Sequence, residues 1–254
     1  SYDLSKEGGW RWIPLKVRWD KTAELKNGGR NYGNSYNVAN SNWQTIHNPI
    51  TEDMISTGKN IDSDTSDIYY TKMYGQSNTK ALRDFHNLYI KMMLIKGVSQ
   101  SGFTLIDLAV GKGGDFSKWI DANLSFIFGI DLSKDNIENR IDGACARYLN
   151  YKKKFKNVPD VLFVNGNSGL NIKNGEAILS EKEKTITKAV FGMGERSERV
   201  LGKGVLKSYG RGKDGFDVCS CQFALHYFFE NMVVLSNFIQ NVADSTKIGG
   251  HFIG

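Results

Sequence analysis

The stretch Ile106-Asp-Leu-Ala-Val-Gly111-Lys-Gly-Gly-Asp115 decides the fold of this chain. Residues 103–110 form an apolar run typical of a buried strand, and residues 116–122 are typical of a short helix. A glycine-rich turn between a strand and a helix lets a ligand approach the backbone at the helix N-terminus. The next predicted strand, residues 125–131, ends in Asp131, 20 residues after Gly111. A carboxylate at that place can hold a ribose through both hydroxyls.

The glycine pattern distinguishes between two kinds of nucleoside cofactor. A dinucleotide-binding G-x-G-x-x-G turn that begins at Gly111 needs a third glycine at position 116, where this chain has Phe116. Because no pyrophosphate-binding turn is completed, an NAD site is disfavoured. S-adenosylmethionine (SAM), a nucleoside without phosphates whose product is S-adenosylhomocysteine (SAH), fits the pattern.

Further elements follow on both sides of this stretch. Residues 81–98 have a helical apolar stripe, and residues 136–155 predict another helix. Three more strands are predicted at residues 161–164, 216–221 and 251–253. Strands that alternate with helices predict an α/β fold with a mainly parallel, Rossmann-like sheet. Residues 171–214 are a Gly- and Lys-rich insertion with one apolar patch at residues 189–191.

Composition excludes several classes of protein. The 254 residues are 40% hydrophobic and 24% charged, which is typical of a globular domain. The net charge of +6 favours a polyanionic partner. Cys145, Cys219 and Cys221 contain no C-x-x-C pair, so we expect neither a disulfide framework nor a zinc site. No apolar run approaches the roughly 18 residues of a membrane span, and no hydrophobic signal core is present. We therefore expect a protein of a reducing compartment, without a membrane partner or any metal.

Three motifs in this order resemble the messenger RNA cap guanine-N7 methyltransferases. They are Arg83-Asp-Phe-His-Asn-Leu-Tyr-Ile-Lys91, Asp107-Leu-Ala-Val-Gly-Lys-Gly-Gly-Asp115 and Cys219-Ser-Cys-Gln-Phe-Ala-Leu-His-Tyr-Phe-Phe-Glu230. The insertion makes the chain most similar to the capping enzymes of large DNA viruses. The resemblance implies the class I SAM-dependent methyltransferase fold and transfer of methyl from SAM to N7 of the guanine cap of RNA.

The resemblance also implies which residues bind the cofactor. Lys91 would meet the methionine carboxylate, Asp131 the ribose, and Asn167 the adenine, although the family usually has an Asp at that position. Ala109 stands where the family has a glycine, so the turn must avoid a positive φ there. The implied cofactor residues are Lys91, Asp107, Ala109, Gly111, Asp131, Asn167, Gln222 and Tyr227.

A second set of residues is implied on the cap side. N7 of guanine carries an unprotonated lone pair, so the reaction needs no general base, and no residue is expected to be catalytic in the strict sense. His226 and Tyr227 would position the guanine. The implied cap and RNA residues are Asn87, Lys112, Asp115, Arg140, His226 and Tyr227. The lysines at residues 152–154, with Lys156, are either an RNA-backbone contact or a solvated helix end.

The N-terminal part carries another resemblance. Residues 8–50 are predicted to be β and loop, because residues 10–19 alternate and several Gly and Asn follow. Val17-Arg18-Trp-Asp20-Lys21-Thr22 resembles the last motif of RNA guanylyltransferases, which closes their OB-fold lid. The resemblance implies that residues 1–50 are the β-rich tail of a guanylyltransferase OB-fold, that residues 51–80 are a linker, and that residues 81–254 are the methyltransferase domain. A β-rich cap on the methyltransferase is the alternative. We expect the last strands of the sheet to lie beyond Gly254.

The resemblance extends to partners and location. It implies the capped mRNA 5′ end and upstream triphosphatase and guanylyltransferase domains of the same polypeptide, and leaves a regulatory subunit open. The implied location is the host cytoplasm, at the viral factory, or the virion. Two alternatives remain: a SAM-dependent methyltransferase of another substrate, such as RNA 2′-hydroxyls, a protein or a small molecule, and a non-catalytic RNA-binding module.

Overall fold

A computed structural model describes residues 2–3, 5–6, 11–13, 15, 17–28, 36–47, 49, 51 and 79–254. The chain forms two compact units, Ser1–Thr65 and Ser66–Gly254. The boundary between them falls within the predicted linker, residues 51–80, of which residues 52–78 lie outside the described part. Within the described ranges, no helix is long and apolar enough to cross a membrane.

The described part of the first unit contains helices where β structure was predicted. α1 (Trp19–Lys26) has Asp20 in its first turn and Lys26 in its last, a charge order that favours a helix. In α2 (Tyr36–His47) the rings of Trp43 and His47, four residues apart, stack with centroids 4.1 Å apart. The prediction of β and loop is therefore wrong for these two segments, which lie after the alternating run of residues 10–19 that suggested β structure. The OB-fold assignment stays a prediction.

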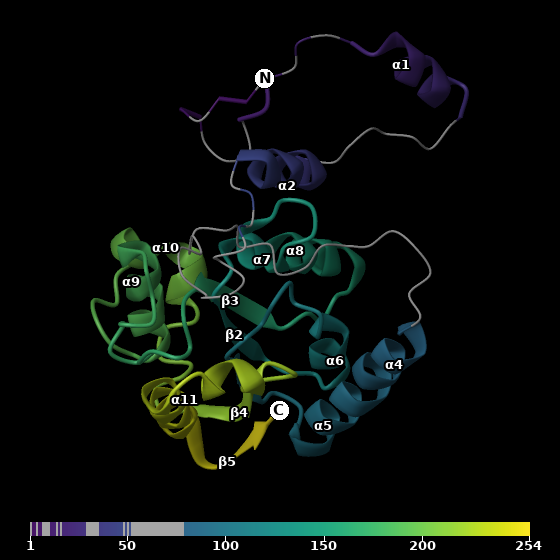
Figure 1. Ribbon diagram of the computed structural model, residues 1–254. Coiled ribbons are helices and arrows are strands. Elements are labelled where there is room, and N and C mark those ends of the chain that lie inside the picture. Colours follow the sequence, from purple (N-terminus) through teal and green to yellow (C-terminus); the bar gives the residue numbers. More distant parts are fainter. Residues whose placement is uncertain are drawn as a thin grey trace. The chain divides into compact units, whose positions relative to one another are not determined.

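The second unit is built around a five-stranded parallel sheet in the order β3-β2-β1-β4-β5 (Figure 1). Its strands are β1 (Thr104–Asp107), β2 (Phe126–Asp131), β3 (Asp160–Asn165), β4 (Phe216–Ser220) and β5 (Thr246–Ile253). The α/β prediction and all five predicted strands are confirmed. β2 and β3 lie on one side of β1, while β4 and β5 lie on the other. Ligands of such sheets bind beyond the carboxyl ends of the strands where the order reverses.

The helix predicted over residues 81–98 is confirmed, with one local departure. It consists of α4 (Lys80–Asp84), a π-helical segment η2 (Phe85–Ile90) and α5 (Lys91–Val98). The departure is noteworthy because π-helical turns are frequent at functional sites. The other helices of this unit are α6 (Phe116–Asp121), α7 (Lys134–Glu138), α8 (Ala144–Lys154), α9 (Glu181–Val190), α10 (Glu198–Leu206), the 3-10 helix η3 (Leu225–Phe229) and α11 (Met232–Ser245).

The single helix predicted over residues 136–155 is wrong: it is divided into α7 and α8. The side-chain Oδ1 of Asn139 accepts hydrogen bonds from the backbone N–H groups of Ile141 (3.0 Å) and Asp142 (3.3 Å). Such a bond to the local backbone competes with helix continuation. Gly143 is the N-cap of α8 and lies in a crowded place, where a Cβ would be 2.7 Å from the backbone of Asn139.

The insertion contributes to the core. Ser180 is the N-cap of α9: its Oγ accepts from the Glu183 N–H, and the hydroxyl in turn donates to the Glu183 carboxylate. At the other end of α9, the predicted apolar patch is buried, with Val190 0% and Phe191 3% exposed. The Phe191 ring packs edge-on against Phe128 of β2.

Two apolar layers cover the faces of the sheet. One layer packs strand residues against α9 and α11, and the other packs them against α5, α6, α7 and α8. Phe116, which replaces the third glycine, is fully buried in the second layer against Trp119 and Tyr151. Position 116 is therefore a core position, which explains why the glycine turn stops before it.

Candidate functional site

A cavity of about 840 Å³ lies beyond the carboxyl ends of β1, β2, β3 and β4. The segments that follow these strands form its walls, together with α4, η2 and α5. Of the predicted site residues, those that line the cavity are Asn87, Lys91, Ala109, Gly111, Lys112, Asp115, Asp131, Asn167, Gln222 and Tyr227. Asp107, Arg140 and His226 are not among the lining residues.

The glycine turn has the backbone that its sequence predicts. Gly111 (φ 55°) and Gly113 (φ 67°) adopt the left-handed conformation that favours glycine. Ala109 is not among the described non-glycine residues with a positive φ, so its substitution for glycine is tolerated. Its N–H donates to Asp107 Oδ1 (3.1 Å). The turn therefore keeps the cavity floor open to a ligand without a strained alanine.

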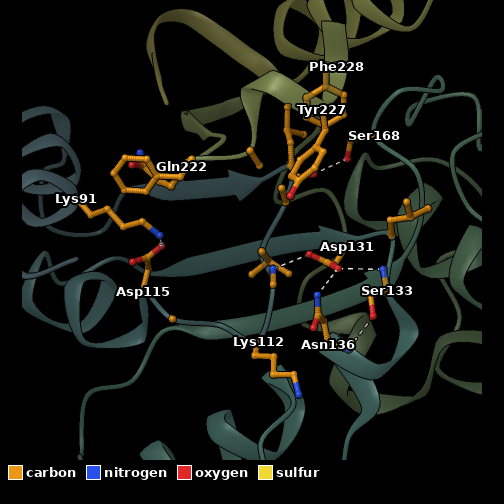
Figure 2. A pocket seen from close by; sticks show the side chains of 18 of the residues that line it. Lys91, Lys112, Asp115, Asp131, Ser133, Asn136, Ser168, Gln222, Tyr227 and Phe228 are labelled. Atoms are coloured by element: carbon orange, nitrogen blue, oxygen red, sulfur yellow. Dashed lines mark hydrogen bonds and ion pairs between the residues drawn. The ribbon is translucent and has the colours of Figure 1, made fainter. Parts of the chain in front are cut away.

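Asp131 is fixed at the end of β2 by three donors. Its Oδ2 accepts from the Gly111 N–H (2.6 Å), and its Oδ1 accepts from the Ser133 N–H (3.0 Å) and Asn136 Nδ2 (2.9 Å). Figure 2 shows Ser133 and Asn136 beside the carboxylate. A carboxylate has about four acceptor sites, so about one remains for a ligand hydroxyl. Binding both ribose hydroxyls would require one of the three protein bonds to open.

Lys91 projects from the start of α5 toward the glycine turn. Its Nζ lies 3.1 Å from Asp115 Oδ2 and 5.4 Å from the centre of the Phe223 ring. Lys118 Nζ contacts the other oxygen of Asp115 at 2.8 Å. Asp115 thus lies between two ammonium groups, one half-buried (Lys91) and one buried (Lys118), and holds Lys91 beside the glycine turn. Figure 2 shows this pair on the opposite side of the view from Asp131.

Gln222 follows β4 and is 7% exposed. Both polar atoms of its side-chain amide are buried, and neither has a hydrogen-bond partner among the described residues. A buried polar group without a partner destabilises the fold by about 1–3 kcal/mol. Because Gln222 also lines the cavity, its amide is available to a ligand with polar groups at that wall.

Asp107 lies at the end of β1, beneath the cavity floor, and is 2% exposed. Burial, together with the nearby carboxylate of Asp115, raises the pKa of Asp107 to about 7. Asp107 contacts the turn through the Ala109 N–H and does not line the cavity, and its role in binding the cofactor stays a prediction.

Asn167 and Ser168 form the wall that follows β3. Asn167 Oδ1 accepts from the Gly169 N–H (2.9 Å), which directs the amide oxygen back into the loop. Ser168 Oγ donates to the Leu108 carbonyl (2.7 Å) and joins this loop to the end of β1. Ser168 lines the cavity but was missed by the sequence analysis, because nothing in a lone serine indicates this contact.

Lys112 is held at the cavity wall by two carboxylates. Its Nζ lies 2.9 Å from Asp142 Oδ1 and 3.2 Å from Asp135 Oδ2. Although burial disfavours its charge, hydrogen bonds to these two residues raise the pKa of Lys112 above its ordinary value. The ammonium is therefore charged and fixed in place.

The segment after β4 presents aromatic side chains. Tyr227 is 52% exposed and lines the cavity. His226 does not line the cavity, but its ring contacts the ring of Tyr227, with the two centroids 4.1 Å apart. Phe223 has a positive φ of 58°, which is unfavourable for a bulky residue. Its ring lies 4.9 Å from that of His86 in η2. The strained Phe223 therefore connects this segment with the helix that carries Asn87.

Arg147 lines the cavity but was not among the residues predicted from the sequence, whereas the predicted Arg140 does not line it. The apolar pattern predicted one helix over residues 136–155. The loop between α7 and α8 changes the helical phase, so that Arg147, in the first turn of α8, reaches the cavity. Asn139 and Gly143 were the signals that could have indicated this break.

Comparison with known proteins gives the family. The sequence model described as "mRNA (guanine-N(7))-methyltransferase domain" matches residues 64–254. The chain is 32% identical over 265 aligned residues to a probable mRNA-capping enzyme of Acanthamoeba polyphaga mimivirus, an alignment that covers 98% of this chain and 21% of that protein. It is 32% identical to the mRNA cap guanine-N(7) methyltransferase of Saccharomyces cerevisiae over 68% of this chain and 31% of that protein. The chain thus spans less than a third of either relative.

A solved SAM-dependent methyltransferase of Geobacter sulfurreducens, in complex with SAH, is 16% identical with a TM-score of 0.34 and covers 65% of this chain and 46% of that chain. The family match covers the whole sheet and every segment that lines the cavity. The chain belongs to the mRNA (guanine-N(7))-methyltransferase domain family.

Proposed function

We propose that this protein transfers the methyl group of SAM to N7 of the guanine cap of RNA. The observation that carries the proposal is the cavity, which gathers Lys91, Asp131 and Gln222 from three separate segments inside the region that the family model matches. This proposal includes the roles of the individual residues.

The residues present fit SAM. A volume of about 840 Å³ is large enough for a nucleoside with an amino-acid tail and for part of a second ligand. Lys91 offers an ammonium to a carboxylate, and Asp131 retains acceptor capacity for a ribose hydroxyl. The unpartnered amide of Gln222 supplies a donor and an acceptor for the polar methionine end.

SAM, when bound, supplies a methyl group on a sulfonium centre that leaves as a neutral thioether. A bond forms between guanine N7 and the methyl carbon as the carbon–sulfur bond breaks, so the positive charge passes to the guanine and no proton moves. The protein's task is to hold its two ligands in line, which supplies several kcal/mol of the barrier reduction. Nearby acidic groups would ease the positive charge as it passes to the guanine.

The outer residues of the cavity are suited to the cap. Tyr227 and Phe223 offer aromatic faces to a purine base, and Asn87 offers an amide. Lys112 and Arg147 provide positive charge for the triphosphate bridge. Because Asp135 and Asp142 already hold Lys112, a phosphate would share that ammonium with them.

The test follows a labelled methyl group. Purified protein is given methyl-labelled SAM and GpppG-capped RNA, with uncapped triphosphate RNA of the same sequence as the control. The product is digested and the labelled nucleoside identified. Label on the cap guanine at N7, with none on the control, is expected. Label on ribose or on protein would contradict guanine N7 as the methyl acceptor. A covalent methyl-enzyme adduct would contradict direct transfer from SAM to the guanine.

Two variants test the residue roles in the same assay. Asp131→Ala is expected to raise the KM for SAM, and Tyr227→Ala the KM for capped RNA, each by about tenfold if about 1.4 kcal/mol of binding is lost. Equal effects of both variants on both KM values would contradict the assignment of separate cofactor and cap sides.

The proposal also places the chain within a longer capping polypeptide of a large DNA virus, active in the host cytoplasm or the virion. The alignment of almost the whole chain with a probable mRNA-capping enzyme of a mimivirus supports this context. The Arg18-x-Asp20-Lys21 motif supports an upstream guanylyltransferase domain. Co-purification of guanylyltransferase and methyltransferase activities from the natural source, on one polypeptide, tests it.

A further inference from the structure

Helix α11 contacts the loop after β3 through two asparagines, four residues apart, that do not line the cavity themselves. Asn241 is 1% exposed. Its Nδ2 donates to the carbonyls of Ser168 (2.8 Å) and Leu170 (2.7 Å), and its Oδ1 accepts from the Ile172 N–H (2.9 Å). Asn237 Nδ2 donates to the carbonyl between them, that of Gly169 (3.1 Å). Three successive carbonyls of one loop are thus bound by a single helix.

This loop forms the cavity wall at Asn167 and Ser168. Gly169 is bonded on both sides: its carbonyl accepts from α11, while its N–H donates to Asn167 Oδ1. The orientation of the Asn167 amide therefore depends on where α11 holds Gly169. A Cβ on Gly169 would lie 3.0 Å from Val234 of the same helix, so the loop and the helix are also in close packing.

The same helix is joined to the opposite wall. α11 follows η3 directly, with Asn231 as its N-cap, and η3 carries Tyr227. α11 therefore connects the wall that ends β3 with the wall that ends β4. Holding both walls in a fixed geometry before a ligand arrives reduces the loss of freedom on binding.

We propose that Asn237 and Asn241 are positioning residues that hold the β3 wall of the cavity in its cofactor-binding geometry. The inference rests on the proposed function, because it assigns the cofactor to that wall. A purely structural role would reduce the fraction of folded protein, yet each folded molecule would bind with unchanged affinity. A positioning role changes the dissociation constant itself at full stoichiometry.

The test measures SAH binding by calorimetry and hydrogen exchange of residues 166–172. Asn241→Asp keeps the acceptor for Ile172 but removes both donors, and is expected to weaken SAH binding about tenfold. Asn237→Ala removes one bond and is expected to weaken it about threefold, with stoichiometry near one. Both should speed exchange in the loop. Gln240→Ala, at an exposed position of the same helix, is the matched control and should change neither quantity.

The outcomes separate this inference from the function on which it rests. A folded Asn237→Ala protein with wild-type SAH affinity and wild-type loop exchange would overturn the positioning role, whatever becomes of Asn241→Asp. If wild-type protein fails to bind SAH, the proposed function fails. In that case the hydrogen-exchange measurement still tests the inference. If residues 166–172 exchange at the wild-type rate in both variants, the two asparagines do not hold the β3 wall and the inference is overturned.

Discussion

Gln222 yields a prediction with two effects of opposite sign. Gln222 is only 7% exposed, and both polar atoms of its side-chain amide are buried without a partner among the described residues. Gln222→Met keeps the length of the side chain and removes both polar atoms. Without ligand, the variant should be more stable than wild type, because the desolvation penalty of an unpaired amide is removed. With ligand, it should bind more weakly, because the amide is no longer there to pair.

The size of each effect follows from the same amide. Relief of the unpaired group raises the free energy of unfolding by about 1–2 kcal/mol, within the usual range of about 1–3 kcal/mol. For a domain of this size that shift raises Tm by about 2–8 °C. Loss of one or more hydrogen bonds to a charged ligand weakens SAH binding by at least about tenfold.

The assay is thermal denaturation with and without SAH, followed by calorimetric titration. Gln240→Met, at an exposed position of α11, is the control and should shift stability by less than about 0.5 kcal/mol. A Gln222→Met protein with lower apo stability and unchanged SAH affinity would refute the reasoning, since the amide would then be neither unpaired in the fold nor used by the ligand.

Three further predictions concern pH, the cap and RNA. Burial raises the pKa of Asp107 from 3.8 to about 7, so the folded state keeps a proton that the unfolded state loses, and stability falls as pH rises between these values. The Asp107→Asn variant should lack this fall. The check is to measure the free energy of unfolding of both proteins at about pH 5 and about pH 8; a difference between wild type and variant that is the same at both pH values would contradict the prediction. Arg147→Met should raise the KM for capped RNA about tenfold and Arg140→Met less than about twofold, because only Arg147 lines the cavity; similar KM values for both would remove this distinction. Changing the lysines at residues 152–154 to Gln should reduce the slope of log affinity against log salt by up to about 2 for single-stranded RNA, and an unchanged slope would identify them as a solvated helix end.

The alternation of strands and helices could be predicted because each pattern is local. The apolar run at residues 103–110, the glycine turn and Asp131 follow one another within one strand-turn-helix-strand unit. Their spacing is set by element lengths that the sequence itself encodes. The grouping of Asp131 and Gln222 at one cavity could be anticipated because the carboxyl ends of parallel strands meet at one edge, whereas Lys91, on a helix before β1, was implied only by the family resemblance.

Local patterns were insufficient where two tendencies compete. Residues 19–26 and 36–47 are helical, although the alternation of residues 10–19 and the turn residues after them favoured β and loop structure. The helix expected over residues 136–155 divides because the side chain of Asn139 binds the local backbone. Such outcomes depend on which hydrogen bonds the remainder of the structure leaves available.

The sequence by itself determined the α/β fold, the glycine turn and the acidic end of β2, because these depend on neighbouring residues. The tertiary structure alone decided that Asp115 pairs with Lys91, 24 residues away, and that Asn241 binds a loop 69–73 residues away. It also decided that the amide of Gln222 has no partner among the described residues. The physical reason is that hydrogen bonding and burial of a side chain depend on the atoms that packing brings around it, and those atoms come from distant parts of the chain.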